Sequence, residues 1–193
     1  MILDPQEMLK AERHLIEGGI NPESLMDEAG LGIANAVSQF FPEPSNLIVF
    51  DGHGHKGGDA FVASRFLKIR GWIVQLKLVT SIDRLKPLTR KKLEQFEKEK
   101  NSTYSSSESG KKLPLISIDG LLGIGASGEL RSEYLEAAKE INKLRSNFDA
   151  VTFSLDIPSG VDGLTGHPYD NACLLYTSPS PRDRTRSRMP SSA

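Results

Sequence analysis

The sequence of 193 residues contains a single cysteine, Cys173, which excludes an internal disulfide framework. So few thiols fit a reducing compartment, and we expect a cytoplasmic protein. No apolar run approaches the length of a membrane span. The N-terminal residues lack a basic region followed by an apolar core, so we expect no secretory signal peptide. The sequence therefore predicts a soluble protein without a membrane partner.

The chain also lacks an excess of charge of either sign, because its formal net charge is −1. This balance gives no indication of a nucleic-acid partner or of binding to an acidic membrane surface. The length is that of one domain, and 38% hydrophobic residues are sufficient for a core. We therefore expect one globular domain.

The composition changes near the C-terminus. Residues 173–193 contain four arginines, five serines and three prolines, without any periodicity. Such a composition is typical of a disordered tail. The string from Leu174 to Asp183 also resembles translated sequencing-adapter sequence, which favours a non-native origin. We therefore expect the domain to cover residues 1–172, to be incomplete at its C-terminal end, and to be followed by a non-native or disordered tail over residues 173–193.

Hydrophobic periodicity predicts alternating helices and strands. Asp4, Pro5 and Glu7 are start signals for a first helix that ends at Gly18-Gly19, and Asn21-Pro22 starts a second helix that ends before Pro42. The second helix is expected to bury one apolar face, made of Leu25, Met26, Ala29, Ile33, Val37 and Phe40. We then expect strands at 46–51, 72–79, 114–119 and 150–156, helices at 57–70, about 88–100 and 129–145, and a polar solvated connection at 101–110. This order favours a Rossmann-like three-layer α/β/α domain with a mostly parallel sheet.

Three of the predicted strands end in an aspartate followed by a glycine-rich or proline-containing turn. The three residues are Asp51, Asp119 and Asp156. Because neighbouring parallel strands bring their carboxyl ends to one edge of a sheet, we expect the three loops to converge on one site. Four strands are few for a doubly wound domain, so either the domain is small or its C-terminal strands are missing, and the adapter-like tail favours the second alternative.

Gly52, Gly54 and Gly57 form the pattern G-x-G-x-x-G between a strand and a helix. Glycines at this place let the backbone approach phosphates, and a helix N-terminus favours anions. A standard hydride-transferring dehydrogenase would also carry an acid at the end of the next strand, where this chain has Val79-Thr80. A phosphate-binding Walker loop is excluded because no Gly-Lys-Ser/Thr is present. The pattern alone therefore indicates phosphate binding without a particular reaction.

Four motifs, in the same order along the chain, together resemble the NAD(P)H-hydrate epimerase family, the YjeF N-terminal domain. The motifs are residues 25–30 (LMDEAG), 52–59 (GHGHKGGD), 119–128 (DGLLGIGASG) and 156–162 (DIPSGVD) with Thr165-Gly166. The resemblance covers about residues 3–172. It implies an isomerase that interconverts the R and S forms of hydrated NADH or NADPH. A nucleotide-dependent dehydratase, separate or fused in the same chain, would then regenerate the cofactor, and a homodimer is suggested.

The resemblance also implies roles for individual residues. Asp156 matches the catalytic aspartate, and a carboxylate there can act as acid–base and stabilise a transient cationic ring. Asp119 and Ser159 match ligands of a bound potassium ion. The residues that match the two substrate-binding loops are His55, Lys56, Gly57, Gly58 and Asp59, and Gly123, Ile124, Gly125, Ala126, Ser127, Gly128 and Glu129. As alternatives, both aspartates can be turn residues, and Ser159 can bond only to the backbone.

One departure from the family pattern affects the cation. Where the family usually has Asn-Asn, this chain has His55-Lys56, and lysine offers no acceptor atom to a metal ion. The Lys56 ammonium group can instead take the place of the potassium ion opposite Asp119, or it can point to solvent or to a substrate phosphate. The substitution also leaves open an alternative function, a non-catalytic module that binds a ligand or associates with itself.

Overall fold

The computed structural model describes residues 4–100 and 113–173. Its centre is a parallel four-stranded sheet with the strand order β2-β1-β3-β4. The strands are β1 (Asn46–Asp51), β2 (Ile73–Leu78), β3 (Leu115–Gly120) and β4 (Val151–Ser154). The predicted connection at 101–110 and the tail beyond Cys173 lie outside the described residues.

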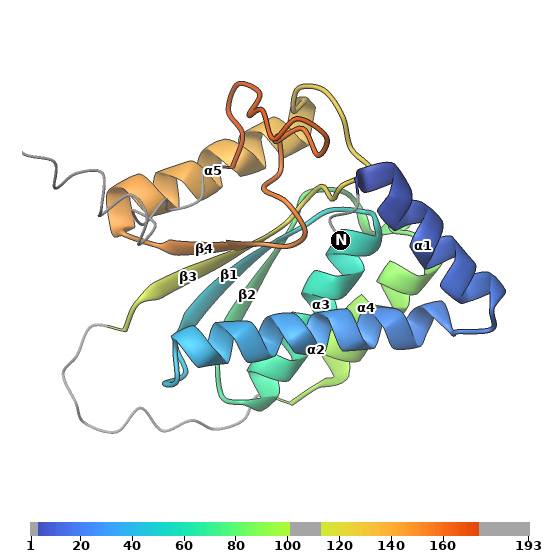
Figure 1. The fold of residues 1–193 in the computed structure, drawn as a ribbon. Helices are drawn as coiled ribbons and strands as arrows, with labels where there is room; N and C mark the ends of the chain where they lie inside the picture. The colour runs from blue at the N-terminus through green and yellow to red at the C-terminus, as the bar shows by residue number, and fades with distance from the viewer. Residues whose placement is uncertain (1–3, 101–112, 174–193) are drawn as a thin grey trace, which may run out of the picture.

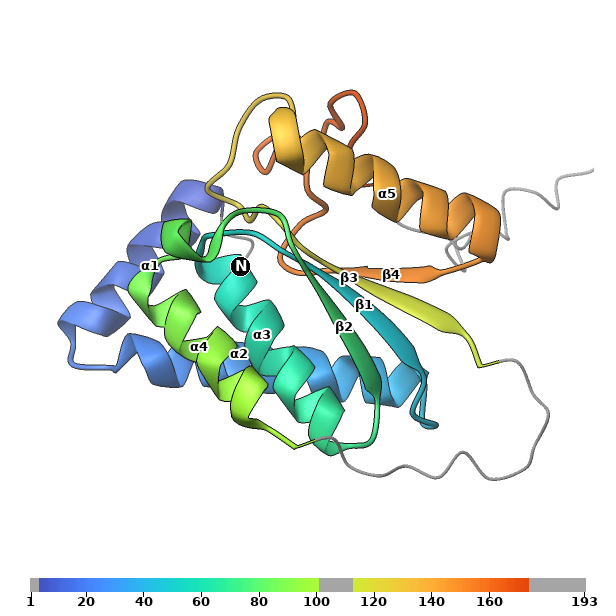
Figure 2. The ribbon, with the colours of Figure 1, turned by 180° about the vertical axis from the view of Figure 1, so that it is seen from behind.

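Helices cover both faces of the sheet, as Figures 1 and 2 show. The helices α2 (Pro22–Phe40), α3 (His55–Ile69) and α4 (Pro87–Lys98) lie on one face, and α5 (Ser132–Phe148) lies on the other. The helix α1 (Pro5–Glu17) lies beside the carboxyl ends of the strands, and the short 3₁₀ helix η1 (Ile82–Arg84) precedes α4. The three-layer α/β/α architecture with two N-terminal helices, predicted from the alternating pattern, is confirmed.

Local start signals act as predicted at both N-terminal helices. The Asp4 carboxylate accepts the Glu7 N–H, and the Glu7 carboxylate accepts the Asp4 N–H, each at 2.8 Å. Asn21 caps α2 by accepting the Glu23 N–H at 2.9 Å. Further along, the predicted helix at 129–145 begins only at Ser132, because Gly128 adopts a left-handed φ of 83° and Leu130 is buried in the segment before the helix.

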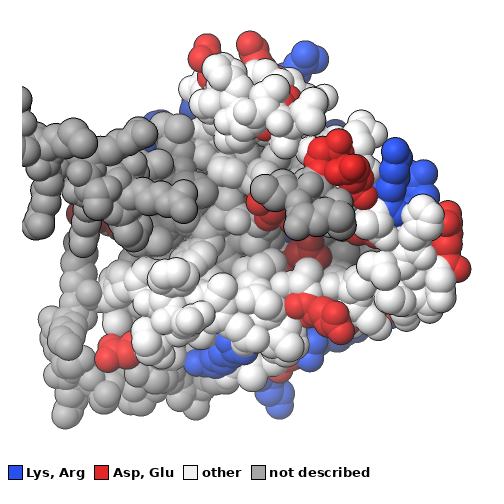
Figure 3. Space-filling model, viewed as in Figure 1, with Lys and Arg blue, Asp and Glu red and all other residues white. Residues whose placement is uncertain are grey.

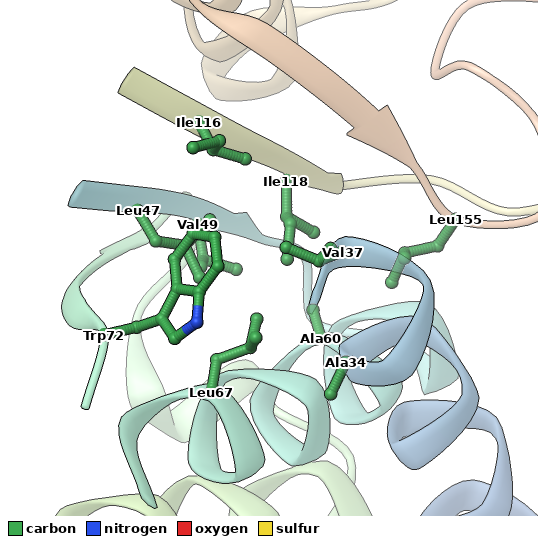
Figure 4. Close-up of a cluster of buried hydrophobic side chains, with 10 residues drawn as sticks. All are labelled: Ala34, Val37, Leu47, Val49, Ala60, Leu67, Trp72, Ile116, Ile118 and Leu155. Carbon is green, nitrogen blue, oxygen red and sulfur yellow. The ribbon is translucent and has the colours of Figure 1, made fainter. Parts of the chain in front are cut away.

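The main core lies between the sheet and the layer formed by α2 and α3 (Figure 4). Its buried members are Ala34, Val37, Leu47, Val49, Ala60, Leu67, Trp72, Ile116, Ile118 and Leu155. A second cluster lies under α5 and includes Phe50, Ile141 and Cys173. Cys173 therefore packs as part of the domain, one residue beyond the expected boundary at 172, which itself stays a prediction.

The expectation that Ala29 and Phe40 belong to the buried face of α2 is wrong, because both residues are exposed, Phe40 to 72%. Phe40 is the last residue of the helix, and its ring lies 5.9 Å from the ring of Phe153 on β4. It therefore packs on one side only. Within the described part of the chain, no helix is both long enough and apolar enough to cross a membrane.

Candidate active site

The loops that follow β1, β3 and β4 meet at one edge of the sheet. The strand register places Asp51 opposite Gly120 and Asp119 opposite Ser154, so the strand ends lie side by side. Asp156 follows two residues after the end of β4. The convergence predicted from the three strand-end aspartates is thus present in the fold.

A pocket of about 460 Å³ opens at this edge, between the three loops and the helices α1 and α2. Figure 3 shows acidic side chains gathered around the hollow beside α1. The predicted site residues that line the pocket are His55, Lys56, Asp59, Gly123, Ile124, Gly125, Ala126 and Asp156. Gly57 and Gly58 are buried behind this lining, and Ser127, Gly128 and Glu129 lie outside it.

Sequence reasoning missed one wall of the pocket. Leu9, Glu12 and Ile16 of α1 line it together with Leu25 and Met26 of α2. The apolar side chains of α1 were a signal in the sequence that could have indicated this wall. None of the α1 residues is buried in the core of the structure. The pocket thus has an apolar wall from the N-terminal helices and a polar floor from the loops.

The first predicted loop is largely the first turn of α3, which starts at His55 rather than at 57. A Cβ on Gly57 would lie 2.1 Å from the carbonyl oxygen of Gly52, and a Cβ on Gly52 would lie 2.1 Å from that of Leu121. These two glycines are therefore required for chain-to-chain contact. Gly54, the N-cap, has open space around it and no side chain caps the helix, so the first-turn N–H groups can receive an anion.

Asp119 is completely buried beneath the pocket lining, where its carboxylate accepts several hydrogen bonds. Its Oδ2 atom accepts hydrogen bonds from the Ser154 hydroxyl and from the Ser159 N–H, both at 2.8 Å. Its Oδ1 atom accepts the Ser159 hydroxyl at 2.6 Å. Asp119 therefore ties the end of β3 to the loop that follows β4, without lining the pocket.

The Lys56 side chain reaches inward and is 3% exposed. Its Nζ donates to the carbonyl oxygen of Leu122 at 2.5 Å and to that of Ile157 at 2.8 Å. The Ser159 hydroxyl lies at 3.5 Å and the Asp119 carboxylate at 3.8 Å. Burial lowers the pKa of Lys56, and the Asp119 and Asp156 carboxylates oppose this shift. Of the three open interpretations for Lys56, this geometry contradicts solvent and substrate phosphate as its partners.

Asp156 is exposed at the pocket and adopts a left-handed φ of 57°. Aspartate tolerates this conformation better than most residues. A Cβ on Gly123 would lie only 2.8 Å from Asp156 Oδ2, so the second loop packs directly against this carboxylate. Of the three strand-end aspartates, Asp156 is the one that lines the pocket.

A second carboxylate, that of Asp59, lines the same pocket from α3. Burial, and then the neighbouring Asp156 and Glu12 carboxylates, raise the pKa of Asp59 from 3.8 to about 8. Asp59 therefore carries a proton at neutral pH. Asp59 and Asp156 thus place two carboxyl groups in the lining of one pocket.

Asp51, the third strand-end aspartate, does not line the pocket, although its place in the sequence suggests that it should. It is completely buried, and neither carboxylate oxygen has a hydrogen-bond partner among the described residues. Burial raises its pKa well above the ordinary value. Within residues 4–100 and 113–173, no group of three or more His, Cys, Asp or Glu side chains is arranged to hold a metal ion.

Comparison with known proteins assigns this chain to a family. Residues 22–177 match the family model described as "YjeF-related protein N-terminus", and the chain therefore belongs to this family. A solved structure has a similar fold, since the chain superposes with a TM-score of 0.70 on the crystal structure of the yeast protein ynu0, YNL200c. That match has 22% identity and covers 84% of this chain and 72% of the yeast chain.

Curated relatives of the chain carry related names. It is 32% identical to an "NAD(P)H-hydrate epimerase" of Rhodopirellula baltica, over 74% of this chain and 58% of the relative. It is 29% identical to a protein of the same name from Cenarchaeum symbiosum, over 88% and 79% respectively. A "Bifunctional NAD(P)H-hydrate repair enzyme Nnr" of Thermosynechococcus vestitus is 32% identical over 86% of this chain. The chain spans 58% and 32% of the length of the first and third of these relatives.

Proposed function

We propose that this protein is an NAD(P)H-hydrate epimerase, an isomerase that interconverts the R and S forms of hydrated NADH and NADPH. The observation that carries the proposal is the position of Asp156, whose carboxyl group lies exposed at the pocket and packs against Gly123 of the second loop. The names of the curated relatives support the same reaction.

The reaction needs a proton at the hydroxyl group of the hydrated ring. Asp156 delivers a proton to this hydroxyl and the carbon–oxygen bond breaks. The hydroxyl group departs as water, and the ring that remains is a cation. The carboxylate left behind stabilises this cation. Water then adds to the opposite face of the ring and returns its proton to Asp156, so that atoms and charge balance.

Substrate binding uses the rest of the pocket. The open first-turn N–H groups of α3 receive a phosphate group of the dinucleotide, and the positive charge of Lys86 at the same opening attracts it. The apolar wall formed by Leu9, Leu25 and Met26 suits the flat face of a ring. Ser127, Gly128 and Glu129 shape the second loop from outside the lining.

The proposal extends to the protein's partners and surroundings. A nucleotide-dependent dehydratase would consume one of the two epimers, acting either as a separate protein or within a longer chain. The bifunctional names of several relatives support this pairing. A homodimer and a cytoplasmic location complete the proposal, the latter supported by the free thiol of Cys173.

The proposal is tested with mixed epimers of hydrated NADH and a dehydratase that accepts only one of them. With the wild-type chain we expect rapid clearance of both epimers. Asp156→Asn should slow the clearance of the second epimer by roughly 100-fold to 10,000-fold, the range for a lost acid–base group. Asparagine keeps the left-handed backbone at this position, so the variant removes the acid without straining the turn.

Asp149→Asn is the matched control, because Asp149 also has a left-handed φ, of 54°, and lies exposed at the end of α5. Its clearance rate should equal that of the wild type. If the wild-type chain binds the hydrated cofactor without converting it, the epimerase proposal fails and the alternative binding module is favoured. Equal rates for the wild type and Asp156→Asn would remove Asp156 from the reaction.

A further inference from the structure

The polar floor of the pocket contains a cage of oxygen atoms around one cation. The cage consists of the Leu122 and Ile157 carbonyl oxygens, the Ser159 hydroxyl and the Asp119 carboxylate, and Lys56 Nζ lies inside it. Carbonyl oxygens arranged in this way can replace the hydration shell of a monovalent cation. Because the ammonium group already fills the centre of the cage, a potassium ion does not fit while Lys56 is present.

We propose that the Lys56 ammonium group is a resident cation that positions the loops of the pocket and makes this protein independent of added monovalent cations. Lys56 acts here as a positioning residue and takes no part in proton transfer. The claim about turnover rests on the proposed function, whereas the claims about cation binding and stability do not.

When Lys56 is charged, the donors of its ammonium group are matched by acceptor oxygens of the cage. An ammonium group has three donors and no acceptor, and every atom around Nζ is an oxygen that can accept. The Ser159 hydroxyl donates its single proton to Asp119 and accepts from the Leu122 N–H at 2.9 Å, which leaves a lone pair for Lys56. One positive and one negative charge are thus enclosed together.

The two shortest contacts of Nζ explain how one cation can position the reacting groups. Leu122 directly precedes Gly123, which packs against the Asp156 carboxylate, and Ile157 directly follows Asp156. Lys56 itself belongs to the first turn of α3, and its side chain is buried. A single ammonium group therefore connects a rigid helix to both loops that surround the catalytic carboxylate.

The experiment replaces the built-in cation with an exchangeable one. Lys56→Asn shortens the side chain, opens the centre of the cage and adds an amide oxygen that a cation can use. For the wild type we expect equal melting temperatures and equal epimerisation rates in potassium chloride and in choline chloride of the same ionic strength. In choline chloride the Lys56→Asn variant should lose ~100-fold in rate, the effect of a small misplacement of reacting groups.

Potassium chloride should then restore most of the rate of Lys56→Asn and raise its melting temperature saturably. Binding of radioactive rubidium, a probe for the same ion size, should appear in the variant and be absent from the wild type. Lys92→Asn is the matched control. Lys92 is also buried, but its partners are the partly exposed Glu23 and Asp27 carboxylates, so its variant should respond equally to potassium and choline salts.

Three results would overturn the inference. They are a wild-type protein whose rate or melting temperature requires potassium, rubidium binding by the wild type, and a Lys56→Asn variant that behaves alike in potassium and choline salts. If Lys56→Asn does not fold in either salt, the wild-type measurements decide alone. If the wild type shows no epimerisation while potassium still stabilises Lys56→Asn selectively, the proposed function fails and the resident cation stands.

Discussion

Among the described residues, two lysine side chains are almost completely buried, and they stabilise two different regions of the molecule. Lys92 of α4 lies 2.9 Å from the Glu23 carboxylate and 2.7 Å from that of Asp27, and thereby joins α4 to α2. Lys56 of α3 lies in the oxygen cage at the carboxyl edge of the sheet. The first lysine joins two helices, whereas the second joins the loops of a site.

The difference lies in how far the partners of each lysine are separated from water. The side chains of Glu23 and Asp27 are 25% and 43% exposed, so water can solvate them if Lys92 is removed. The Asp119 side chain is 0% exposed and cannot be solvated in the same way. Two buried lysines of similar appearance are therefore expected to differ strongly in energetic cost and in their effect on function.

The largest difference should appear when each lysine is replaced by methionine, which keeps the apolar stem and removes the charge. Lys56→Met leaves the Asp119 carboxylate buried without its cation, and removal of one partner from a buried pair costs about 3–5 kcal/mol. Lys92→Met leaves carboxylates that water reaches, and we expect a loss of about 1 kcal/mol, typical of exposed pairs. Urea denaturation measures both free energies of unfolding.

The activity of the two methionine variants should also differ. In the assay of the proposed epimerase reaction, the folded fraction of Lys92→Met should retain the wild-type rate, whereas Lys56→Met should lose activity even where it remains folded. Equal losses of stability in the two variants would show that solvation of the partners does not decide the cost. A fully active Lys56→Met would contradict the link between the cage and the Asp156 loop.

Glycine-to-alanine exchanges test whether the two regions also differ in tolerance to added volume. A Cβ on Gly123 would lie 2.8 Å from Asp156 Oδ2, so Gly123→Ala should displace this carboxylate and slow epimerisation by roughly 10-fold to 100-fold. Gly32 lies exposed within α2 and has open space around it. Gly32→Ala should leave the rate unchanged and stabilise the fold by about 0.5–1 kcal/mol.

Rate measurements and thermal melts of the two alanine variants separate these effects. A Gly123→Ala variant that loses stability but keeps its rate would mean that the second loop yields without moving Asp156. A Gly32→Ala variant that is less stable than the wild type would mean that the helix layer is more tightly packed than the space around Gly32 indicates.

Elements with local signals were predictable from the sequence. The capping box of α1, the Asn21 cap of α2 and the alternation that gives a parallel sheet depend on neighbouring residues, so they can be read along the chain. The start of α5 was misplaced by three residues because a left-handed glycine and the burial of Leu130, both tertiary features, extend the preceding loop.

The site was predictable in composition but not in detail. Asp119 and Asp156 have the same apparent place at a strand end, yet β3 includes Asp119 whereas β4 ends at Ser154, two residues before Asp156. The pairing of β3 with its neighbouring strands thus buries the Asp119 carboxylate, whereas Asp156 lies beyond the paired part of β4 and is exposed. The destination of the Lys56 side chain depends on the end of β3 and on two loops that are remote in sequence, so no local pattern could distinguish between its alternatives.

The smallest expected effect concerns acid and is confined to the Lys92 region. Hydrogen bonds from Lys91 and Lys92 lower the pKa of Glu23 from 4.5 to about 2. Between these pH values the folded state binds fewer protons than the unfolded state, so the stabilisation is complete above pH 4.5 and is lost as pH falls toward 2. Glu23→Gln should cost about 1 kcal/mol or less at neutral pH, as for exposed ion pairs. Melting temperatures of wild type and Glu23→Gln should therefore converge as pH falls through this window, and parallel curves would show that Lys92 gains nothing from the charge of Glu23.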